Sequence, residues 1–242
     1  MGKRLVFVPD CHSTNTLALQ LAQNALNTEG TVVITNHQSA GRGQQGKRWE
    51  SAPGMNLTFS LILKPSFLSL NDQYYLTIMT SLALHDYLTE QIRGDHTLYI
   101  KWPNDILVHE KKICGILIEN QLQGNRLLSC VVGVGLNMNQ TAFETPSATS
   151  LQLVTGRQTD LETSLGDLLG CIEARFLQLR ALDLAALKEQ YLNRLYRIDE
   201  KHNYAAGSRR FQGIIRGINK AGKLVVETSA GLGFFGMKEI RF

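Results

Sequence analysis

A nine-residue segment that combines glycines with cations offers the clearest chemistry in this chain. Residues 41–49 read GRGQQGKRW, so three glycines alternate with Arg42, Lys47 and Arg48 before the indole of Trp49. Glycine lets the backbone take positive φ and approach a ligand closely, and arginine binds carboxylate or phosphate through a planar fork of donors. The segment therefore predicts a flexible loop that binds an anion.

The same segment matches the dinucleotide-binding pattern G-x-G-x-x-G, but its surroundings argue against that interpretation. A dinucleotide site needs a helix that opens at the last glycine and an acidic residue about twenty positions further on. Here Gly46 is followed by Pro53, which a regular helix does not tolerate in its interior, and no acid stands near residue 66. An anion-binding loop is favoured, with a plain surface hairpin as the alternative.

A second polar segment, KWPND at residues 101–105, ends a predicted strand. Asn104 and Asp105 after Pro103 are common turn residues, so an ordinary turn is one interpretation. An ATP site is the other, because the indole of Trp102 could provide a stacking face and Asn104 a hydrogen-bonding edge. The carboxylate of Asp105 could then help to hold Mg²⁺ beside phosphates.

Two lysines open a third segment, KKICGILIE at residues 111–119. Side chains alternate along a strand, so Lys112 is expected on one apolar face with Cys114 and the isoleucines at 116 and 118, and Lys111 on the solvent side. A lysine on a buried face is costly without an anion. Lys112 is therefore a candidate ligand-binding cation, and an exposed hairpin lysine is the alternative.

A fourth strand ends in alternating glycines, GVGLN at residues 133–137. Gly133 and Gly135 leave the backbone open, so that another group can lie flat on it. Asn137 could reach a phosphate or a ribose. A strand-end bulge is the alternative interpretation.

The composition limits the classes of protein to which the chain can belong. With 242 residues, 43% of them hydrophobic and 19% charged, it suits one soluble domain with a small additional module. A net charge of +4 without long charge runs suits anionic small molecules or an acidic protein partner, and gives little support for nucleic acid. The four cysteines lack metal-ligand spacing, which predicts reduced thiols and a cytoplasmic protein, and no apolar run approaches the ~18 residues of a membrane span.

Hydrophobic periodicity predicts an α+β framework for these segments. Ser13 is a suitable N-cap for a helix with Leu17, Leu21 and Ala25 on one face, which ends near residues 27–30. Predicted strands cover 4–8, 31–35, 56–63, 98–102, 106–109, 113–120 and 126–134, and predicted helices cover 72–92, 161–179 and 184–196. Short β runs at 211–218, 224–227 and 233–235 then predict a small barrel. The predicted layout is one domain over 1–195 and a C-terminal module over 196–242.

In this order the segments resemble the biotin protein ligases. The matching elements are Ser13-Thr14-Asn15, Gln38 with the GRG-x-x-G-x-x-W loop, KWPND, K-x-x-G-I-L-I-E, G-x-G-x-N and the segment at 148–151. The resemblance spans roughly residues 3–195 and implies a class II aminoacyl-tRNA synthetase-like sheet with helices. It also implies an SH3-like barrel at the C-terminus. Lipoate ligases share the fold, but not KWPND together with the tryptophan-terminated loop.

The resemblance implies an activity and a set of site residues. Family members activate biotin with ATP and Mg²⁺ to biotinyl-5′-AMP, and then transfer biotin to one lysine of a biotin carboxyl carrier protein. The implied catalytic residues are Lys112 and Arg42, which hold carboxylate and phosphate, and Asp105 beside Mg²⁺ or the incoming amine. Biotin-binding residues would be Ser13, Thr14, Asn15, Gln38, Arg42, Gly43, Gln44, Lys112, Gly115, Gly133 and Gly135. Residues for ATP and the adenylate would be Arg42, Lys47, Arg48, Trp49, Asn104, Asp105, Lys112 and Asn137, with Mg²⁺ held mainly through ATP phosphates.

Some features separate this chain from other members or leave alternatives open. Gln44 stands where many members carry a second arginine, so retention of the adenylate rests on Arg42. Only twelve residues precede Ser13, which leaves no room in this sequence for a three-helix DNA-binding unit, and no operator binding is expected. The loop is expected to close as a lid over its ligand, and the family allows a homodimer. Two alternative functions stay open. One is a lipoate or octanoate ligase, for which Asn15 and Gln38 would lack a partner, and the other is a non-enzymatic nucleotide-binding module.

Overall fold

A seven-stranded mixed sheet forms the centre of the protein. The computed structural model describes residues 1–23, 29–94 and 96–242, with Gln45 described by its backbone alone. The strands are β1 (Leu5–Cys11), β2 (Val32–Gln38), β3 (Leu57–Leu63), β4 (Leu98–Lys101), β5 (Asp105–Val108), β6 (Lys111–Gln123) and β7 (Arg126–Leu136). They lie in the order β1-β2-β3-β7-β6-β5-β4, and β1 pairs with β2 in parallel whereas the other neighbours are antiparallel.

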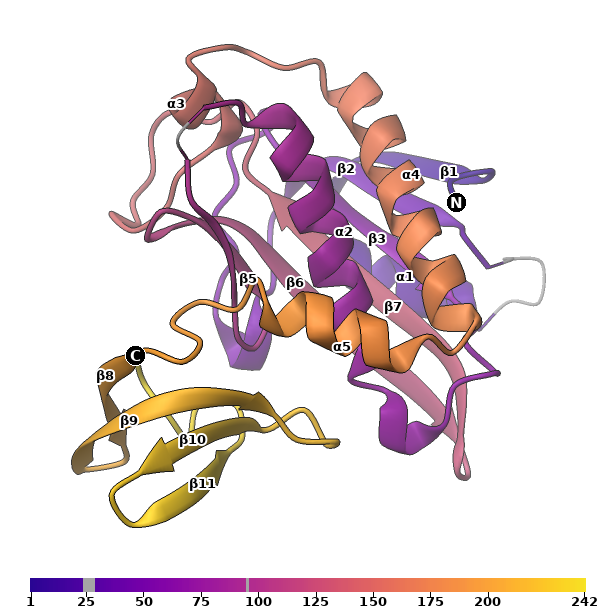
Figure 1. The fold of residues 1–242 in the computed structure, drawn as a ribbon. Coiled ribbons are helices and arrows are strands. Elements are labelled where there is room, and N and C mark those ends of the chain that lie inside the picture. The colour runs from indigo at the N-terminus through magenta and orange to yellow at the C-terminus, as the bar shows by residue number, and fades with distance from the viewer. Residues whose placement is uncertain (24–28, 95) are drawn as a thin grey trace.

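Helices cover both faces of this sheet (Figure 1). On one face lie α2 (Tyr75–Gln91), α4 (Leu161–Arg180) and α5 (Leu184–Leu192), with α2 in contact with both of the others. On the opposite face α1 (Thr14–Ala22) contacts β2, β3 and β7. The remaining helical turns are α3 (Leu151–Thr155) and the 3₁₀ turns η1 (Gln44–Gly46) and η2 (Leu70–Asp72). The predicted residue Ala25 and the helix end near 27–30 lie outside the described residues, apart from Glu29 and Gly30, which form a turn.

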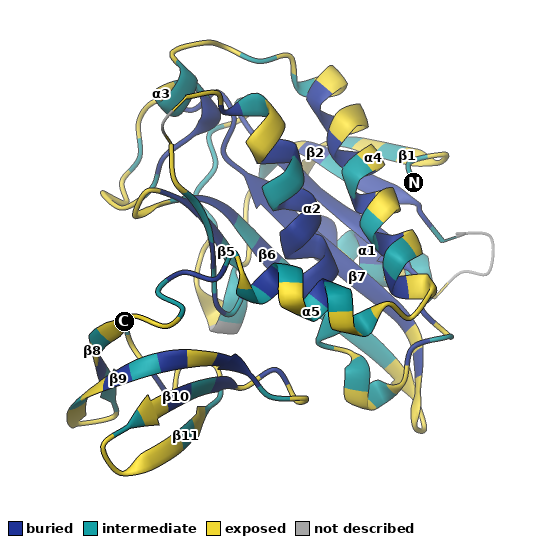
Figure 2. Cartoon of the chain, in the orientation of Figure 1, coloured by how far each residue is buried: buried dark blue, intermediate teal, exposed yellow. Residues whose placement is uncertain are grey.

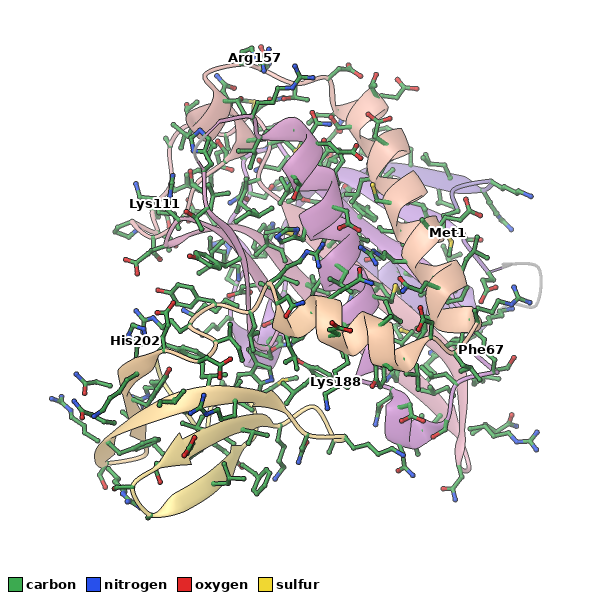
Figure 3. The ribbon with its side chains drawn as sticks, in the orientation of Figure 1. Met1, Phe67, Lys111, Arg157, Lys188 and His202 are labelled. Carbon is green, nitrogen blue, oxygen red and sulfur yellow. The ribbon has the colours of Figure 1, made fainter. Side chains whose placement is uncertain are left out.

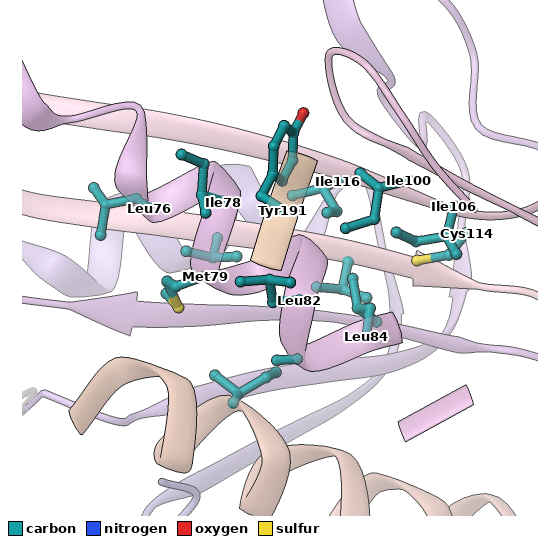
Figure 4. Close-up of a cluster of buried hydrophobic side chains, with 14 of the residues drawn as sticks. Leu76, Ile78, Met79, Leu82, Leu84, Ile100, Ile106, Cys114, Ile116 and Tyr191 are labelled. Atoms are coloured by element: carbon teal, nitrogen blue, oxygen red, sulfur yellow. The ribbon is translucent and has the colours of Figure 1, made fainter. Parts of the chain in front are cut away.

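The main core fills the space between α2 and the sheet. Figure 2 shows α2 buried along most of its length. Figure 4 shows its side chains Leu76, Met79 and Leu82 packed near Ile116 of β6 and Tyr191 of α5. Strand β3 is buried at every residue because it lies inside the sheet with helices on both sides. This rigid centre holds the strand ends from which the candidate site is built.

A bulge in β6 determines where Lys112 points. Cys114 lies opposite Ile106 of β5, but Lys112 lies opposite the next residue, Leu107, so β6 carries one extra residue at Ile113. An extra residue reverses the alternation of side chains on either side of it. Cys114 therefore faces the α2 core, whereas a Cβ added at Gly115 would lie 3.1 Å from Lys112 Nζ.

The expectation that Lys112 shares a face with Cys114 and the isoleucines at 116 and 118 is thus wrong. Strict alternation does not hold across the bulge, and Lys112 shares the α1 face of the sheet with Gly115 instead. Lys111 is exposed on the outside of the molecule, as expected (Figure 3).

The C-terminal residues form a second, antiparallel sheet. Its strands are β8 (Lys201–Ala206), β9 (Arg209–Ile218), β10 (Leu224–Thr228) and β11 (Gly231–Phe235), in the order β11-β10-β9-β8. In the described part of the chain β11 and β8 are outer strands that do not pair, so the sheet is open where a closed barrel was expected. The free edge of β8 is instead covered by the chain end, because Ala205 exchanges two backbone hydrogen bonds with Arg241. No helix among the described residues is both long and apolar enough to cross a membrane.

Candidate functional site

Segments far apart in sequence line one small cavity on the α1 face of the sheet. The cavity has a volume of about 50 Å³. Its walls come from the start of α1, the end of β2, the glycine loop, β6 and β7. All the residues that the resemblance implied for biotin contribute to it: Ser13, Thr14, Asn15, Gln38, Arg42, Gly43, Gln44, Lys112, Gly115, Gly133 and Gly135. The fold therefore brings these residues together, while their roles remain a prediction.

A buried hydrogen-bond network fixes the polar end of the cavity. The N–H of Thr14, at the first turn of α1, donates to Gln38 Oε1 at 2.7 Å, which satisfies a donor that a helix start leaves unpaired. Asn15 Nδ2 donates to the carbonyl of Leu117 at 3.2 Å. Ser60 Oγ lies 2.6 Å from Asn15 Oδ1 and 2.8 Å from Thr14 Oγ1. These contacts hold the α1 side chains and Gln38 in defined orientations.

Ser60 is a member of this network that sequence reasoning missed. It lies in the apolar stretch LTFSLIL of β3 and is completely buried. The only available signal was a hydroxyl inside a strand that is otherwise almost wholly apolar. A buried hydroxyl needs a partner, and its partners on α1 are 45 and 46 residues away in sequence, so they could not be identified from the strand itself.

The glycines of β6 and β7 are required by close contacts. A Cβ at Gly133 would overlap the side-chain amide of Asn15, and one at Gly135 would overlap the indole of Trp49. At Gly115 the added atom would lie 3.0 Å from Trp49 Cζ3. As expected for alternating glycines, another group approaches the Gly135 backbone closely, and that group is a side chain of this chain.

The glycine loop itself is a short hairpin that delivers Trp49 to the cavity. Arg42 and Arg48 form an antiparallel bridge, and the N–H of Trp49 donates to the carbonyl of Gly41 at 2.9 Å. The tip is the 3₁₀ turn η1, in which Gly46 has φ of +80°. No helix opens at Gly46, so the dinucleotide interpretation is excluded, as expected.

Arg42 has an acidic partner that the sequence interpretation did not assign. Its Nη2 lies 3.2 Å from Glu119 Oε2 and 3.2 Å from Thr16 Oγ1. Glu119 is the last residue of the K-x-x-G-I-L-I-E segment and also accepts from Asn15 Nδ2 at 2.8 Å. The pair is partly exposed, at 45% and 29% of the two side chains. An ion pair of that exposure is worth about 0–1 kcal/mol, so Arg42 can exchange it for another anion.

Lys112 stands at the junction of three cavities. Its Nζ lies 2.7 Å from Asp105 Oδ1, and 5.4 Å from the ring centre of Trp49. Besides the small cavity, Lys112 lines two larger ones of about 410 and 570 Å³ on the far side of Trp49. The Lys112 side chain is 35% exposed and that of Asp105 25%, so a ligand can reach the pair, although Asp105 Oδ1 itself is buried.

Both larger cavities are lined by cations. Lys47, Arg48 and Lys101 contribute to each of them together with Lys112. The pKa of Lys101 is lowered, first because burial disfavours its charged form, although Asp105 opposes the shift. Repulsion from Arg197, Lys112 and Lys47 adds to it. A region in which cations repel one another favours the binding of a polyanion, and Lys101 is a contributor that was not singled out beforehand.

Asn104 and Asn137 both serve structural contacts at the edges of these cavities. Asn104 Nδ2 donates to the carbonyl of Ile116 at 2.5 Å, and Ile116 N–H donates back to Asn104 at 3.0 Å. Asn137 Nδ2 donates to the carbonyl of Thr149 at 2.9 Å, whereas its buried Oδ1 has no hydrogen-bond partner among the described residues. Asn137 Oδ1 is therefore an acceptor that a ligand could satisfy.

Trp102 does not offer the stacking face that was considered for it. Its side chain is 3% exposed, and its Nε1 donates to the carbonyl of Gly222 at 2.9 Å. Gly222 lies in the turn before β10, so this indole joins the first sheet to the C-terminal sheet. The partner lies 120 residues away, which explains why local sequence suggested an exposed ring.

A polar cavity and cation-lined cavities lie on either side of Lys112, an arrangement that suits a small polar molecule held next to a polyanion. Residues 8–137 match the biotin/lipoate A/B protein ligase family. The chain is 34% identical over 227 residues to the biotin–[acetyl-CoA-carboxylase] ligase of Paracoccus denitrificans, which covers 90% of this chain and 92% of that protein. It is 32% identical over 237 residues to the bifunctional ligase/repressor BirA of Bacillus subtilis, covering 96% of this chain and 72% of that protein.

A solved structure agrees with these relatives. The biotin protein ligase from Aquifex aeolicus in complex with biotin and ATP has a TM-score of 0.80 and 25% identity, and the match covers 99% of this chain and 98% of that chain. This chain belongs to the biotin/lipoate A/B protein ligase family.

Proposed function

We propose that this chain is an ATP-dependent biotin–protein ligase. It activates biotin to biotinyl-5′-AMP and transfers biotin to a lysine of a biotin carboxyl carrier domain. The observation that carries the proposal is the position of Lys112 between the polar cavity and the cation-lined cavities. The relatives named as biotin ligases, and the similar structure that holds biotin and ATP, support it.

In the first step an oxygen of the biotin carboxylate attacks the α-phosphorus of ATP. The bond from that phosphorus to the bridging oxygen breaks, and pyrophosphate leaves with the electron pair. Two anions must approach each other, so a positioned cation in a partly enclosed site lowers the barrier. Lys112, oriented by Asp105 at 2.7 Å, would lie between them, and Arg42 would exchange Glu119 for the ligand.

The ureido group of biotin needs donors and acceptors at fixed positions. Ser13, Thr14, Asn15 and Gln38 would provide them, and the orientation of the last three is already set by the buried network. The apolar rings and tail would lie along the glycine face of β6 and β7. There the backbone of Gly115 and Gly135 would be uncovered once the Trp49 indole has moved, Gly133 makes space for the Asn15 side chain, and Gly43 and Gln44 would close the loop side.

Trp49 must move for biotin to enter. Ligand pockets usually have volumes of about 300–1,000 Å³, and the cavity of about 50 Å³ is small because the indole lies on Gly135. The buried indole N–H also has no hydrogen-bond partner among the described residues, and such a donor is unfavourable. Residues 41–49 would therefore act as a lid that shifts to admit biotin and closes over it.

In the second step the amine of the carrier lysine attacks the acyl carbon. The bond between that carbon and the phosphate oxygen breaks, AMP leaves, and the amine loses a proton. Asp105 would orient the incoming amine, while Lys47, Arg48, Trp49, Asn104 and Asn137 would hold the AMP moiety. The net charge of +4 suits an acidic carrier.

Several finer assignments belong to the same proposal. No three His, Cys, Asp or Glu side chains in the described residues could hold a metal ion, so Mg²⁺ would be held mainly by the ATP phosphates, with Asp105 as the available side-chain ligand. The proposal also includes a homodimer. It assigns a class II aminoacyl-tRNA synthetase-like fold to residues 1–195 and an SH3-like fold to residues 196–242. All four cysteines are free thiols, which suits the proposed cytoplasmic location.

One assay tests the proposed function. The protein is incubated with ATP and Mg²⁺, together with either biotin or lipoate, and pyrophosphate release is followed. We expect release that depends on biotin. Release that depends on lipoate would point to the other branch of the family, and no release with either acid would contradict a ligase.

A further inference from the structure

Glu50, the residue directly after Trp49, bridges two loops of the site. Its Oε1 accepts a hydrogen bond from the N–H of Glu144 at 2.7 Å, and its Oε2 accepts one from the N–H of Thr145 at 3.2 Å. Both oxygens of one carboxylate are therefore used by consecutive backbone amides. Charge-assisted hydrogen bonds of this kind are stronger than neutral ones.

The segment that Glu50 holds, residues 143–148, forms a wall of the 410 Å³ cavity. Phe143, Thr145, Ser147 and Ala148 line that cavity, and the segment joins β7 to α3 without regular structure. Its far end is fixed at Lys112, whose N–H donates to Ser147 O at 2.7 Å and whose carbonyl accepts from Thr149 N–H at 2.9 Å.

The near end of the segment is fixed separately. Asn139 N–H donates to the carbonyl of Met55 at 2.8 Å. The side chain of Gln140 accepts from Ala52 N–H at 2.8 Å and from Asn56 Nδ2 at 2.6 Å. In the described structure the contact that ties residues 143–146 to the glycine loop is the pair of bonds to Glu50.

The charge of Glu50 supports a dedicated role. Lys47 and Arg48 line the same cavity, yet the Glu50 carboxylate forms no ion pair within the described residues; its partners are the two amides. The carboxylate keeps its negative charge, but its oxygens are directed at the two amides and not at Lys47 or Arg48. Their charge stays available to a polyanion.

We propose that Glu50 is a positioning residue that latches residues 143–148 to the Trp49 end of the lid. Trp49 lines the small cavity and both larger ones, so a change in its position reaches Glu144 and Thr145 through the adjacent carboxylate. Biotin binding under Trp49 and nucleotide binding beside residues 143–148 then favour each other. Such coupling acts equally in both directions. The inference rests on the proposed function for its two ligands.

The first test measures hydrogen exchange and needs no turnover. Exchange of the amides of Glu144 and Thr145 is compared in the wild type, Glu50→Ala, Glu50→Gln and the control Glu144→Ala, which alters an exposed side chain but keeps its N–H. Loss of a charge-assisted bond should speed exchange about tenfold or more in Glu50→Ala. Glu50→Gln keeps one acceptor oxygen, so its exchange rate should lie between those of the wild type and Glu50→Ala. The control should exchange at the wild-type rate. Added biotin should slow hydrogen exchange at these two amides in the wild type and not in Glu50→Ala.

The second test separates positioning from chemistry. At saturating biotin, Glu50→Ala should raise KM for ATP about tenfold and change kcat less than about threefold, because no reacting atom is touched. A loss confined to kcat would overturn the inference, because Glu50 would then act on the reacting atoms. Identical exchange at Glu144 and Thr145 in wild type and Glu50→Ala would also overturn it. If the wild type releases no biotin-dependent pyrophosphate, the proposed function fails, and the exchange comparison still decides whether the latch exists.

Discussion

Replacing Gly135 with alanine tests how tightly Trp49 is seated. The new Cβ would overlap three atoms of the indole. Strand β7 cannot move away because it pairs with β3 on one side and β6 on the other. The indole must therefore leave the position in which it fills the empty cavity, so biotin no longer has to displace it.

The magnitude follows from the cost of overpacking, which is about 1–3 kcal/mol for an added methylene in a packed site. If that cost falls only on the empty protein, the Kd for biotin should fall roughly 5- to 150-fold, and the free energy of unfolding of the empty protein should fall by the same amount, about 1–3 kcal/mol. The matched control is Gly166→Ala in α4, where the new Cβ meets no atom. That change should stabilise the protein by about 0.5–1 kcal/mol and leave biotin binding unchanged.

A double variant makes the test sharper. Without the indole there is nothing to overlap, so Trp49→Ala combined with Gly135→Ala should bind biotin as Trp49→Ala alone does, and the two effects should not add. Calorimetric titration with biotin gives the three dissociation constants. Additive effects of the two substitutions, or an unchanged Kd in Gly135→Ala, would refute the reasoning.

Three further outcomes are expected. Arg42→Ala should shorten the lifetime of bound biotinyl-5′-AMP, and an unchanged lifetime in a rapid-filtration assay would contradict the role of Arg42 in holding the adenylate. The free energy of unfolding should change by less than about 1 kcal/mol, because the ion pair of Arg42 with Glu119 is partly exposed. The pKa of His85 is lowered to about 4, first because burial disfavours the charged ring and then because Arg194 repels it. The unfolded chain therefore binds the proton more readily, and up to about 3 kcal/mol of stability should be lost as pH falls from 6.5 to 4. In urea unfolding, His85→Gln should lose less stability than the wild type over the same pH range. Trp102→Phe leaves the buried carbonyl of Gly222 without its donor and should lower stability by about 1–3 kcal/mol in thermal unfolding; no change would mean that the indole N–H does not join the two sheets.

The local features of the site could be predicted from sequence to a large extent. The glycine loop, the strands on either side of KWPND and the glycine pair of β7 depend on short stretches of chain. Gly135 was expected to let a flat group approach, because alternating glycines at a strand end have that consequence wherever the strand lies. The resemblance to a family then named the cavity residues from α1 to β7 together.

The remaining features depend on contacts between distant segments. Lys112 was expected on the wrong face because the bulge at Ile113 follows from pairing with β5, which the β6 sequence alone does not reveal. Ser60 and Glu50 gained their roles only from partners more than forty residues away. Strand β8 was missed because it buries only Tyr204 fully and shows little apolar alternation. The sheet that contains it stays open, since the chain end at Arg241 takes the edge where a barrel would close.

The position of Lys112 is the central claim, and steady-state kinetics of biotin-dependent pyrophosphate release test it most directly. The comparison is between the wild type and Lys112→Gln, with the Kd for biotin measured in parallel. Removing one positioned charge from a site of this kind lowers kcat by a factor of roughly 10²–10³. We predict such a loss in kcat together with weaker biotin binding, because Lys112 would also contact the biotin carboxylate. A variant that releases pyrophosphate at the wild-type rate would contradict the assignment of Lys112 as the cation between carboxylate and phosphate.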